Sequence, residues 1–134
     1  MRAGNGDIIH GPGDVYDLVA PELSHLDHEV VKLIMLDAHN RLIGCETIST
    51  GEAETTLLRP REVFASALKN SAASIVLVHN HPSGSPEPSK PDIDLTRRIA
   101  RIGRELGVLV QDHVIIGKGG YVSLMARHIL KLIR

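Results

Sequence analysis

Residues 74–116 read SIVLVHNHPSGSPEPSKPDIDLTRRIARIGRELGVLVQDHVII, and this stretch decides the predicted fold. Its first part, Ser74 to Val78, is a short apolar run, which indicates a buried strand. A loop rich in proline and glycine follows, and then a helix is predicted from about Lys90 to Leu106, ended by Gly107. Val108 to Ile116 is predicted to be the next strand. A strand, a helix and another strand in this order are typical of a layered α/β domain.

The residues before this stretch predict a hairpin between two helices. A helix is expected from about Asp14 to Leu26, with Pro21 as a break or restart. The nearly continuous apolar run from Glu29 to Leu36 is typical of a strand covered on both faces. Arg41 to Ser49 is predicted to be the returning strand, and a helix should run from Pro60 to about Lys69. The hairpin favours a mixed sheet, so the predicted fold class is a single α/β domain with a mixed sheet flanked by helices.

The ends of the chain and the long helix complete this prediction. Tyr121 to Ser123 is expected to form a short strand, and the tail from about Leu124 to Arg134 a helix. Residues 1–13 are rich in glycine and are interpreted as a flexible lead-in, so the domain is expected to occupy residues 14–134. Helical spacing predicts that the long helix buries one apolar stripe, formed by Leu95, Ile99, Ile102 and Leu106.

Composition narrows the classes of protein that fit. The chain has 134 residues, near the commonest size of one domain, and 43% of them are hydrophobic but only 2% aromatic, which predicts an aliphatic core. A net charge of -1 gives no general attraction to nucleic acid or membranes. A single cysteine, Cys45, excludes an intrachain disulfide and cysteine-rich zinc sites. A reducing cytoplasm is the expected setting, and no membrane partner is expected because every apolar run is too short to span a bilayer.

The chemistry is predicted to lie in His79-Asn80-His81-Pro82 and Ser89-Lys90-Pro91-Asp92. Residues two apart in an extended segment point to the same side, so the imidazoles of His79 and His81 can converge on one ion. The loop then turns back, and Asp92 in the first turn of the helix can supply a third ligand. Two imidazoles and one carboxylate can hold zinc and leave a coordination position open, which is the arrangement of a catalytic site. The pattern therefore predicts a metal-dependent hydrolase.

Each half of this pattern has a simpler interpretation. A His-x-His pair is weak on its own, and Ser89-x-x-Asp92 resembles a helix capping box with aspartate in place of glutamate. The two halves together favour the metal site, and Ser89 can cap the helix while Asp92 binds metal. A zinc nucleobase deaminase is poorly supported, because it needs a Pro-Cys-x-x-Cys segment and the one cysteine is Cys45. A contiguous His-Asn-His is not the HNH nuclease motif, which spans a longer segment.

These residues resemble a known family. His79-x-His81-Pro82 followed by Ser89-x-x-Asp92 is similar to the JAMM motif of MPN-domain metalloproteases. A longer similarity, to the bacterial RadC-like branch of that superfamily, runs from about Val15 to Ser123. It is carried by the sequences RPREV at residues 59–63, VHNHPSG at 78–84, PS at 88–89 and DHVIIG at 112–117.

The resemblance implies a cytidine-deaminase-like α/β sandwich with a Zn²⁺ ion held by His79, His81 and Asp92. It also implies a water in the fourth position, an upstream glutamate as general base, and Ser89 helping to hold the water or the developing oxyanion. By position the glutamate is Glu29, with Glu46 as the second choice. The implied reaction is hydrolysis of a peptide or isopeptide bond in a peptide or protein substrate.

Two other functions compete with the metallopeptidase. One is a DNA-repair-associated or nucleic-acid processing protein, as the RadC resemblance suggests, and the other is a non-catalytic MPN-type scaffold. RadC-like proteins usually carry an N-terminal helix-hairpin-helix region, and this chain has no room for it, which weakens the case for DNA. Arg97, Arg101 and Arg104 could bind phosphate, but a solvated helix face is the preferred interpretation. His113 could lie near the site, since the family pattern includes it, but a structural histidine is the preferred interpretation. The substrate and oligomeric state stay open.

Overall fold

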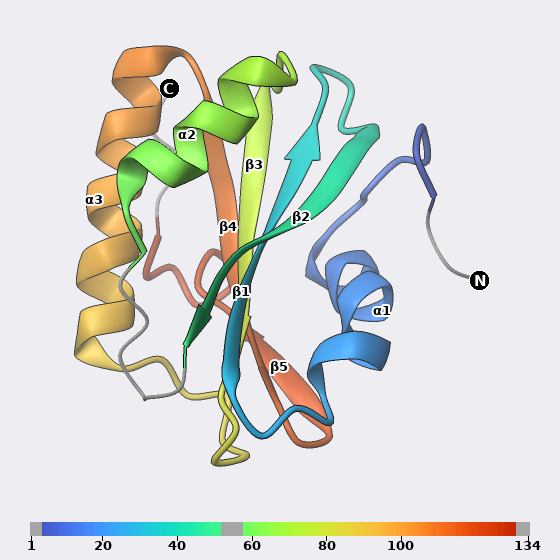
Figure 1. The fold of residues 1–134 in the computed structure, drawn as a ribbon, viewed down its shortest axis with the longest axis vertical. Coiled ribbons are helices and arrows are strands. Elements are labelled where there is room, and N and C mark those ends of the chain that lie inside the picture. The colour runs from blue at the N-terminus through green and yellow to red at the C-terminus, as the bar shows by residue number, and fades with distance from the viewer. Residues whose placement is uncertain (1–3, 52–57, 131–134) are drawn as a thin grey trace.

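The computed structural model describes residues 4–51 and 58–130, and a five-stranded mixed sheet lies at its centre (Figure 1). The strands are β1 (Glu29–Leu36), β2 (Leu42–Gly51), β3 (Ser74–Asn80), β4 (Leu109–Gly117) and β5 (Gly120–Ser123). Their order across the sheet is β2-β1-β3-β4-β5, with β3 and β4 parallel and the other neighbours antiparallel. The predicted mixed α/β domain is confirmed.

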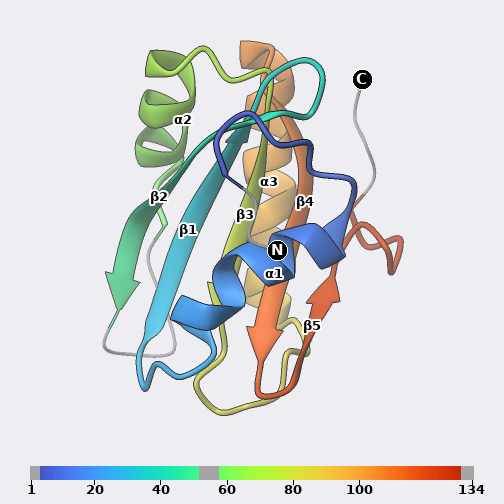
Figure 2. The same cartoon turned by 90° about the vertical axis from the view of Figure 1, so that its right-hand side faces the viewer.

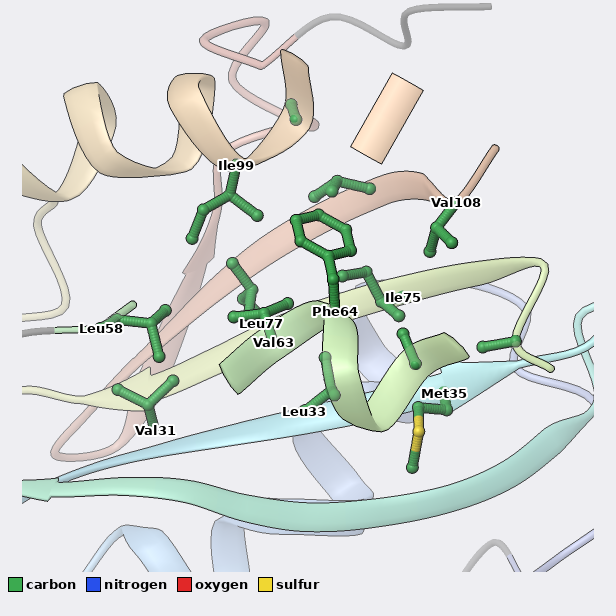
Figure 3. Packing of buried hydrophobic residues seen from close by; sticks show 14 of the residues in the cluster. Val31, Leu33, Met35, Leu58, Val63, Phe64, Ile75, Leu77, Ile99 and Val108 are labelled. Atoms are coloured by element: carbon green, nitrogen blue, oxygen red, sulfur yellow. The ribbon is translucent and has the colours of Figure 1, made fainter. Parts of the chain in front are cut away.

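Three helices cover the two faces of this sheet: α1 (Pro12–Leu23), α2 (Pro60–Lys69) and α3 (Lys90–Leu106). Helices α2 and α3 lie on one face and α1 on the other, as the two perpendicular views show (Figures 1 and 2). Each face has its own buried cluster, and both clusters are almost entirely aliphatic, as the composition predicts. Figure 3 shows the one phenylalanine of the chain, Phe64, in the α2/α3 layer with Ile99, Ile75 and Leu77 around it.

Alternation along β1 and β3 assigns side chains to the two faces. Val31 pairs with His79 across these antiparallel strands, so both side chains point to the α2/α3 face. Leu77 lies two residues before His79 and faces the same way, whereas Val78 joins the cluster under α1. The end of β3 therefore directs a histidine toward the side on which α3 begins.

Local sequence signals place the two ends of α3. A proline follows the N-cap Ser89 within the first helical positions, and Ser89 and Asp92 form the expected capping box. At the other end Gly107 has φ 76°, and the Val108 amide donates to the Gly103 carbonyl at 2.8 Å, which closes the helix in a Schellman motif. The predicted bounds of α3 are confirmed.

Three predictions about helices are wrong. Helix α1 continues through Pro21 to Leu23, because burial of its apolar side against the sheet outweighs one missing backbone hydrogen bond. In the stripe predicted for α3, Ile99 is buried and Leu95 and Ile102 pack against the core, but Leu106 is 45% exposed. The buried positions of the helix are Thr96, Ile99, Ala100 and Gly103. Small residues lie there because the helix packs closely: a Cβ on Gly103 would overlap the Val108 carbonyl oxygen and come within 3.3 Å of Phe64.

The third wrong prediction concerns the tail. Residues 124–130 form turns, and residues 131–134 lie outside the described part of the chain. A single turn after Ser123 ends at once, because His128 adopts φ 61° and the Ile129 amide bonds back to the Leu124 carbonyl at 2.9 Å. The apolar periodicity of the tail did not reveal this left-handed stop.

Strand β3 is also longer than predicted, since it includes His79 and Asn80. The apolar run ends at Val78, but β1 and β4 pair with the strand on both sides up to these residues. No helix within residues 4–51 and 58–130 has the length and hydrophobicity that crossing a bilayer requires.

Candidate metal centre

Four predicted site residues meet at the carboxyl end of β3. Glu29 begins β1, His79 lies near the end of β3, His81 follows that strand, and Asp92 lies in the first turn of α3. One ligand atom from each of these residues lies within 4.8 Å of the others. Strands β1 and β3, which supply Glu29 and His79, are about 50 residues apart along the chain. Their pairing in the sheet brings these two side chains together.

The shortest distances centre on Nε2 of His79. It lies 3.0 Å from Nε2 of His81, 3.4 Å from Oε1 of Glu29 and 3.4 Å from Oδ1 of Asp92. Nε2 of His81 is 3.1 Å from Oδ2 of Asp92. Two imidazole nitrogens with carboxylate oxygens are a donor set that zinc prefers, so the residues present fit this metal.

The cluster combines two buried and two half-buried residues. Glu29 is 7% exposed and His79 is 2% exposed, whereas His81 and Asp92 are half-buried. The buried pair lies on the sheet, and the half-buried pair lies on the loop and helix that cover it. His81 and Asp92 are therefore the more accessible members of the cluster, and Glu29 and His79 lie deeper.

Asn80 holds the backbone around Glu29. Its Oδ1 accepts a hydrogen bond from the Val30 amide at 2.8 Å, and its Nδ2 donates to the His28 carbonyl at 2.9 Å. Asn80 points away from the cluster, to the α1 side of the sheet. From there its two bonds hold the peptide groups on either side of Glu29. Asn80 thus faces the protein interior and not the cluster.

Ser89 and Asp92 combine capping with the site. The Ser89 amide donates to Oδ2 of Asp92 at 2.9 Å, and Oγ of Ser89 accepts from the Asp92 amide at 3.2 Å. Burial alone raises the pKa of Asp92, but the adjacent rings of His79 and His81 and the Ser89 amide together outweigh burial and hold that pKa well below its usual value. Asp92 is therefore ionised, as a metal ligand must be. Ser89 itself is exposed, at the rim of the cluster.

His81 is oriented by the loop that follows it. Its amide donates to the Ile116 carbonyl at 2.8 Å, and its Nδ1 lies 3.0 Å from the Ser85 carbonyl oxygen. A carbonyl only accepts, so Nδ1 carries the hydrogen and Nε2 is the nitrogen that faces the cluster. The hydrogen bond with Asp92 raises the pKa of His81, burial opposes this shift, and the Ser85 carbonyl supports it.

Glu46, the second choice for the general base, lies elsewhere. It is an exposed residue of β2 whose carboxylate accepts a hydrogen bond from the Ser66 hydroxyl on α2. It pairs with Leu33 in the β1–β2 ladder, four residues along β1 from Glu29. Of the two glutamates, only Glu29 belongs to the cluster.

Two residues next to the cluster were not predicted as parts of it. His113 on β4 is 3% exposed, and its Nε2 lies 2.6 Å from Nδ1 of His79. Its other ring nitrogen contacts the hydroxyl of Thr96, a fully buried residue of α3. Burial, with a smaller effect from the charge of His79, holds the pKa of His113 well below its usual value, so the ring is neutral. Two sequence features could have pointed to these residues: His113 follows Asp112 in the family-like DHVIIG segment, and Thr96 lies one helical turn after Asp92.

Comparison with known proteins assigns the family. The sequence profile of the RadC-like JAB domain matches residues 9–129. A UPF0758 protein of Clostridium novyi is 44% identical over 129 residues, which are 96% of this chain and 57% of that protein. A UPF0758 protein of Caldanaerobacter subterraneus subsp. tengcongensis is 47% identical over 116 residues, covering 87% of this chain and 50% of the relative.

A third relative, from Symbiobacterium thermophilum, is 43% identical over 119 residues, or 89% of this chain and 51% of its own length. The chain therefore belongs to the RadC-like JAB domain family, and the predicted resemblance is confirmed. It spans about half the length of the curated relatives that it matches. Together with the cluster, this assigns a JAB-type domain with a set of side chains able to hold a metal ion.

Proposed function

We propose that this domain is a zinc-dependent hydrolase of peptide or isopeptide bonds. His79, His81 and Asp92 would hold the metal, and Glu29 would act as the general base. The observation that carries the proposal is the convergence of two imidazoles and two carboxylates at one strand end. Membership of the JAB family supports it, because the residues that match the JAMM motif are the ones that converge.

Zinc bound at this site would lower the pKa of a coordinated water to about 7 and polarise the substrate carbonyl. The carboxylate of Glu29 would accept the proton of the attacking water and later deliver it to the leaving amine. Its burial beside His79 holds it at a fixed position, and the two hydrogen bonds of Asn80 fix the backbone that carries it. With His79, His81 and Asp92 as the three protein ligands, Glu29 would serve in proton transfer.

Ser89 would assist at the rim of the site. Its Oγ accepts the Asp92 amide hydrogen, which leaves its own hydroxyl hydrogen available for a second bond. That hydrogen could be donated to the oxyanion that forms on the substrate carbonyl. Ser89 would thus cap the helix and stabilise the transition state with different parts of one hydroxyl group.

The first test is the metal content of the protein purified without chelator. We expect one zinc per chain by inductively coupled plasma mass spectrometry, and loss of that zinc on dialysis against a strong chelator. Absence of stoichiometric zinc in the wild-type protein would overturn the metal site and the hydrolase proposal with it.

The second test separates the two glutamates. Glu29→Gln should keep the zinc but reduce hydrolysis of fluorogenic peptide and isopeptide substrates by about 10²–10⁴-fold. Glu46→Gln is the matched control on the neighbouring strand and should retain both zinc and activity. If Glu46→Gln abolished hydrolysis and Glu29→Gln did not, the general base would be misassigned.

A nucleic-acid role is the alternative function. The observation that favours it is a row of exposed arginines on α3, formed by Arg97, Arg98, Arg101 and Arg104. Arginines on one helix face can neutralise phosphates, and such binding would weaken steeply with salt. Charge reversal on this row, described in the Discussion, distinguishes the two functions.

A further inference from the structure

A chain of buried hydrogen bonds leads from α3 to His79. Oγ1 of Thr96 donates to the Asp92 carbonyl at 2.7 Å. The same oxygen contacts Nδ1 of His113, and Nε2 of His113 lies 2.6 Å from Nδ1 of His79. Thr96 is fully buried and His113 and His79 are almost so; the bond to Asp92 lies within α3, and the other two contacts join α3 to β4 and β4 to β3. The chain reaches His79 on the side opposite to the cluster.

The bond from Thr96 to the Asp92 carbonyl sets the direction of the other hydrogen bonds in this chain. A carbonyl only accepts, so the single hydroxyl hydrogen of Thr96 is committed to Asp92. Oγ1 of Thr96 must therefore accept from His113, which places a hydrogen on Nδ1 of His113. In a neutral imidazole the other nitrogen is an acceptor, so Nε2 of His113 accepts from Nδ1 of His79.

We propose that Thr96 and His113 are positioning residues that keep a hydrogen on Nδ1 of His79 and thereby direct its Nε2 lone pair to the metal. This inference rests on the proposed function, because Nε2 of His79 is the nitrogen that faces the other ligands. Partners of this kind fix the tautomer and ring orientation of metal-binding histidines. The Ser85 carbonyl likewise keeps a hydrogen on Nδ1 of His81, so both rings turn Nε2 toward the other ligand groups.

The reverse direction would produce a different site. If Nε2 of His113 carried the hydrogen, Nδ1 of His79 would have to accept it, and the remaining hydrogen of His79 would lie on Nε2. A protonated Nε2 cannot bind metal until that hydrogen leaves. The Thr96 hydroxyl decides between the two directions, because its hydrogen is already used by Asp92.

The first experiment reads the tautomers directly. Long-range ¹⁵N–¹H correlation spectra of the metal-free and zinc-loaded wild-type protein should show His113 with a hydrogen on Nδ1 and none on Nε2. His79 should carry a hydrogen on Nδ1 in both samples. A hydrogen on Nε2 of neutral His113 would overturn the proposal, whether or not the protein binds zinc.

The second experiment changes the two residues in matched pairs and measures zinc affinity by competition with a chelator. Thr96→Val keeps the size but removes the hydroxyl, and we expect zinc to bind about 10–100-fold more weakly. Thr96→Ser keeps the hydroxyl, and its zinc affinity should stay within about 3-fold of the wild type, below the 10–100-fold loss expected when such a partner is removed. Wild-type affinity in Thr96→Val would overturn the proposal.

His113 provides the second pair, so the test does not depend on one variant. His113→Leu removes the acceptor for Nδ1 of His79 and should weaken zinc binding about 10–100-fold. His113→Gln can offer an amide oxygen to the same hydrogen and should restore most of the affinity. Equal loss in both variants, with equal unfolding curves, would mean that His113 only fills space. Failure of zinc binding in the wild type would instead contradict the proposed function. The ¹⁵N–¹H spectra of His113 and His79 in the metal-free protein would still test the positioning role.

Discussion

The two faces of the sheet differ most where β3 ends. The face under α1 is mainly aliphatic, as Val76, Val78 and Ile34 show, and its Asn80 bonds to backbone, whereas the α2/α3 face carries the cluster of ligand groups there. Both faces need apolar burial for stability, at roughly 25 cal/mol per Å² of apolar surface. The difference shows that one layer can both stabilise the sheet and present chemistry, provided that the polar groups lie at the strand end.

Neighbouring residues of β3 illustrate the contrast. Leu77 and His79 face α3, and Val78 and Asn80 face α1, because side chains alternate along a strand. At the end of the strand the helix N-terminus supplies Asp92 to the one face. On the other face Asn80 uses both polar atoms on the backbone beside Glu29. Four predictions test this division of the sheet.

The largest effect is expected when the cluster itself is broken. His79→Ala should abolish stoichiometric zinc binding, because it removes the nitrogen closest to the three other ligand groups. The matched control is Val78→Ala on the opposite face, which should keep zinc but lower the free energy of unfolding by roughly 2 kcal/mol. Metal analysis and urea unfolding measure the two effects. Loss of zinc in Val78→Ala would show that the faces are not independent.

The loop over the cluster should be nearly as sensitive. A Cβ on Gly117 would overlap the Gly84 carbonyl oxygen and lie 2.7 Å from Cδ of Pro86, so Gly117→Ala should push the loop from β4 and disturb the Ser85 contact to His81. We expect zinc affinity to fall about 10–100-fold, as for other supporting contacts. The control is Gly120→Ala in the same hairpin, where a Cβ has no neighbour within 4 Å. Equal affinities in the two variants would contradict this role of the loop.

A smaller effect is expected at Asp112, a buried carboxyl group beside His113. Burial raises the pKa of Asp112, and hydrogen bonds from the Ser123 hydroxyl and the Met125 and His113 amides oppose this only in part. The folded protein thus holds this proton more tightly than the unfolded chain, whose aspartate pKa is about 3.9. The stability that this proton contributes is complete below that value and is lost as the pH rises through the folded pKa.

Asp112→Asn removes this titration. The free energy of unfolding of the wild type minus that of Asp112→Asn should therefore decrease as the pH rises from about 4. Urea unfolding of both proteins at a series of pH values measures this difference. Parallel pH curves for the two proteins would show that the carboxyl group titrates alike in the folded and unfolded chains.

The smallest effect is expected on the outer face of α3. Arg97→Glu with Arg101→Glu should leave zinc content unchanged and change the free energy of unfolding by about 0.5 kcal/mol or less per site, since both side chains are exposed. The accompanying measurement is binding to DNA at several salt concentrations. Salt-dependent binding that disappears in the double variant would favour the nucleic-acid function over the hydrolase.

Much of the fold could be predicted because local signals agreed with it. The apolar run of β1, the proline at the start of α2, and Ser89 and Gly107 at the ends of α3 each mark an element that the structure confirms. The errors occur where packing or backbone geometry acts against a local rule. Pro21 is tolerated inside α1, and Gly103 rather than Leu106 lies against the layer below α3.

Some residues of the site could also be predicted from local sequence, and others could not. His79, His81 and Asp92 could be predicted because they belong to one strand–loop–helix unit. Glu29 required the family resemblance, since nothing in the sequence around it distinguishes it from Glu46. His113 and Thr96 were missed as partners of the cluster because their contacts depend on the register of β4 and the rotation of α3.

The sequence by itself determined the order of elements, the ends of α3 and the side chains that could bind metal, because these follow from periodicity, capping and the chemistry of each residue. Only the tertiary structure decided which glutamate joins the cluster and which atoms of the histidines face it. Those properties depend on pairing between distant strands and on buried hydrogen bonds. Such contacts form only when residues far apart in the chain are brought within about 3 Å of each other.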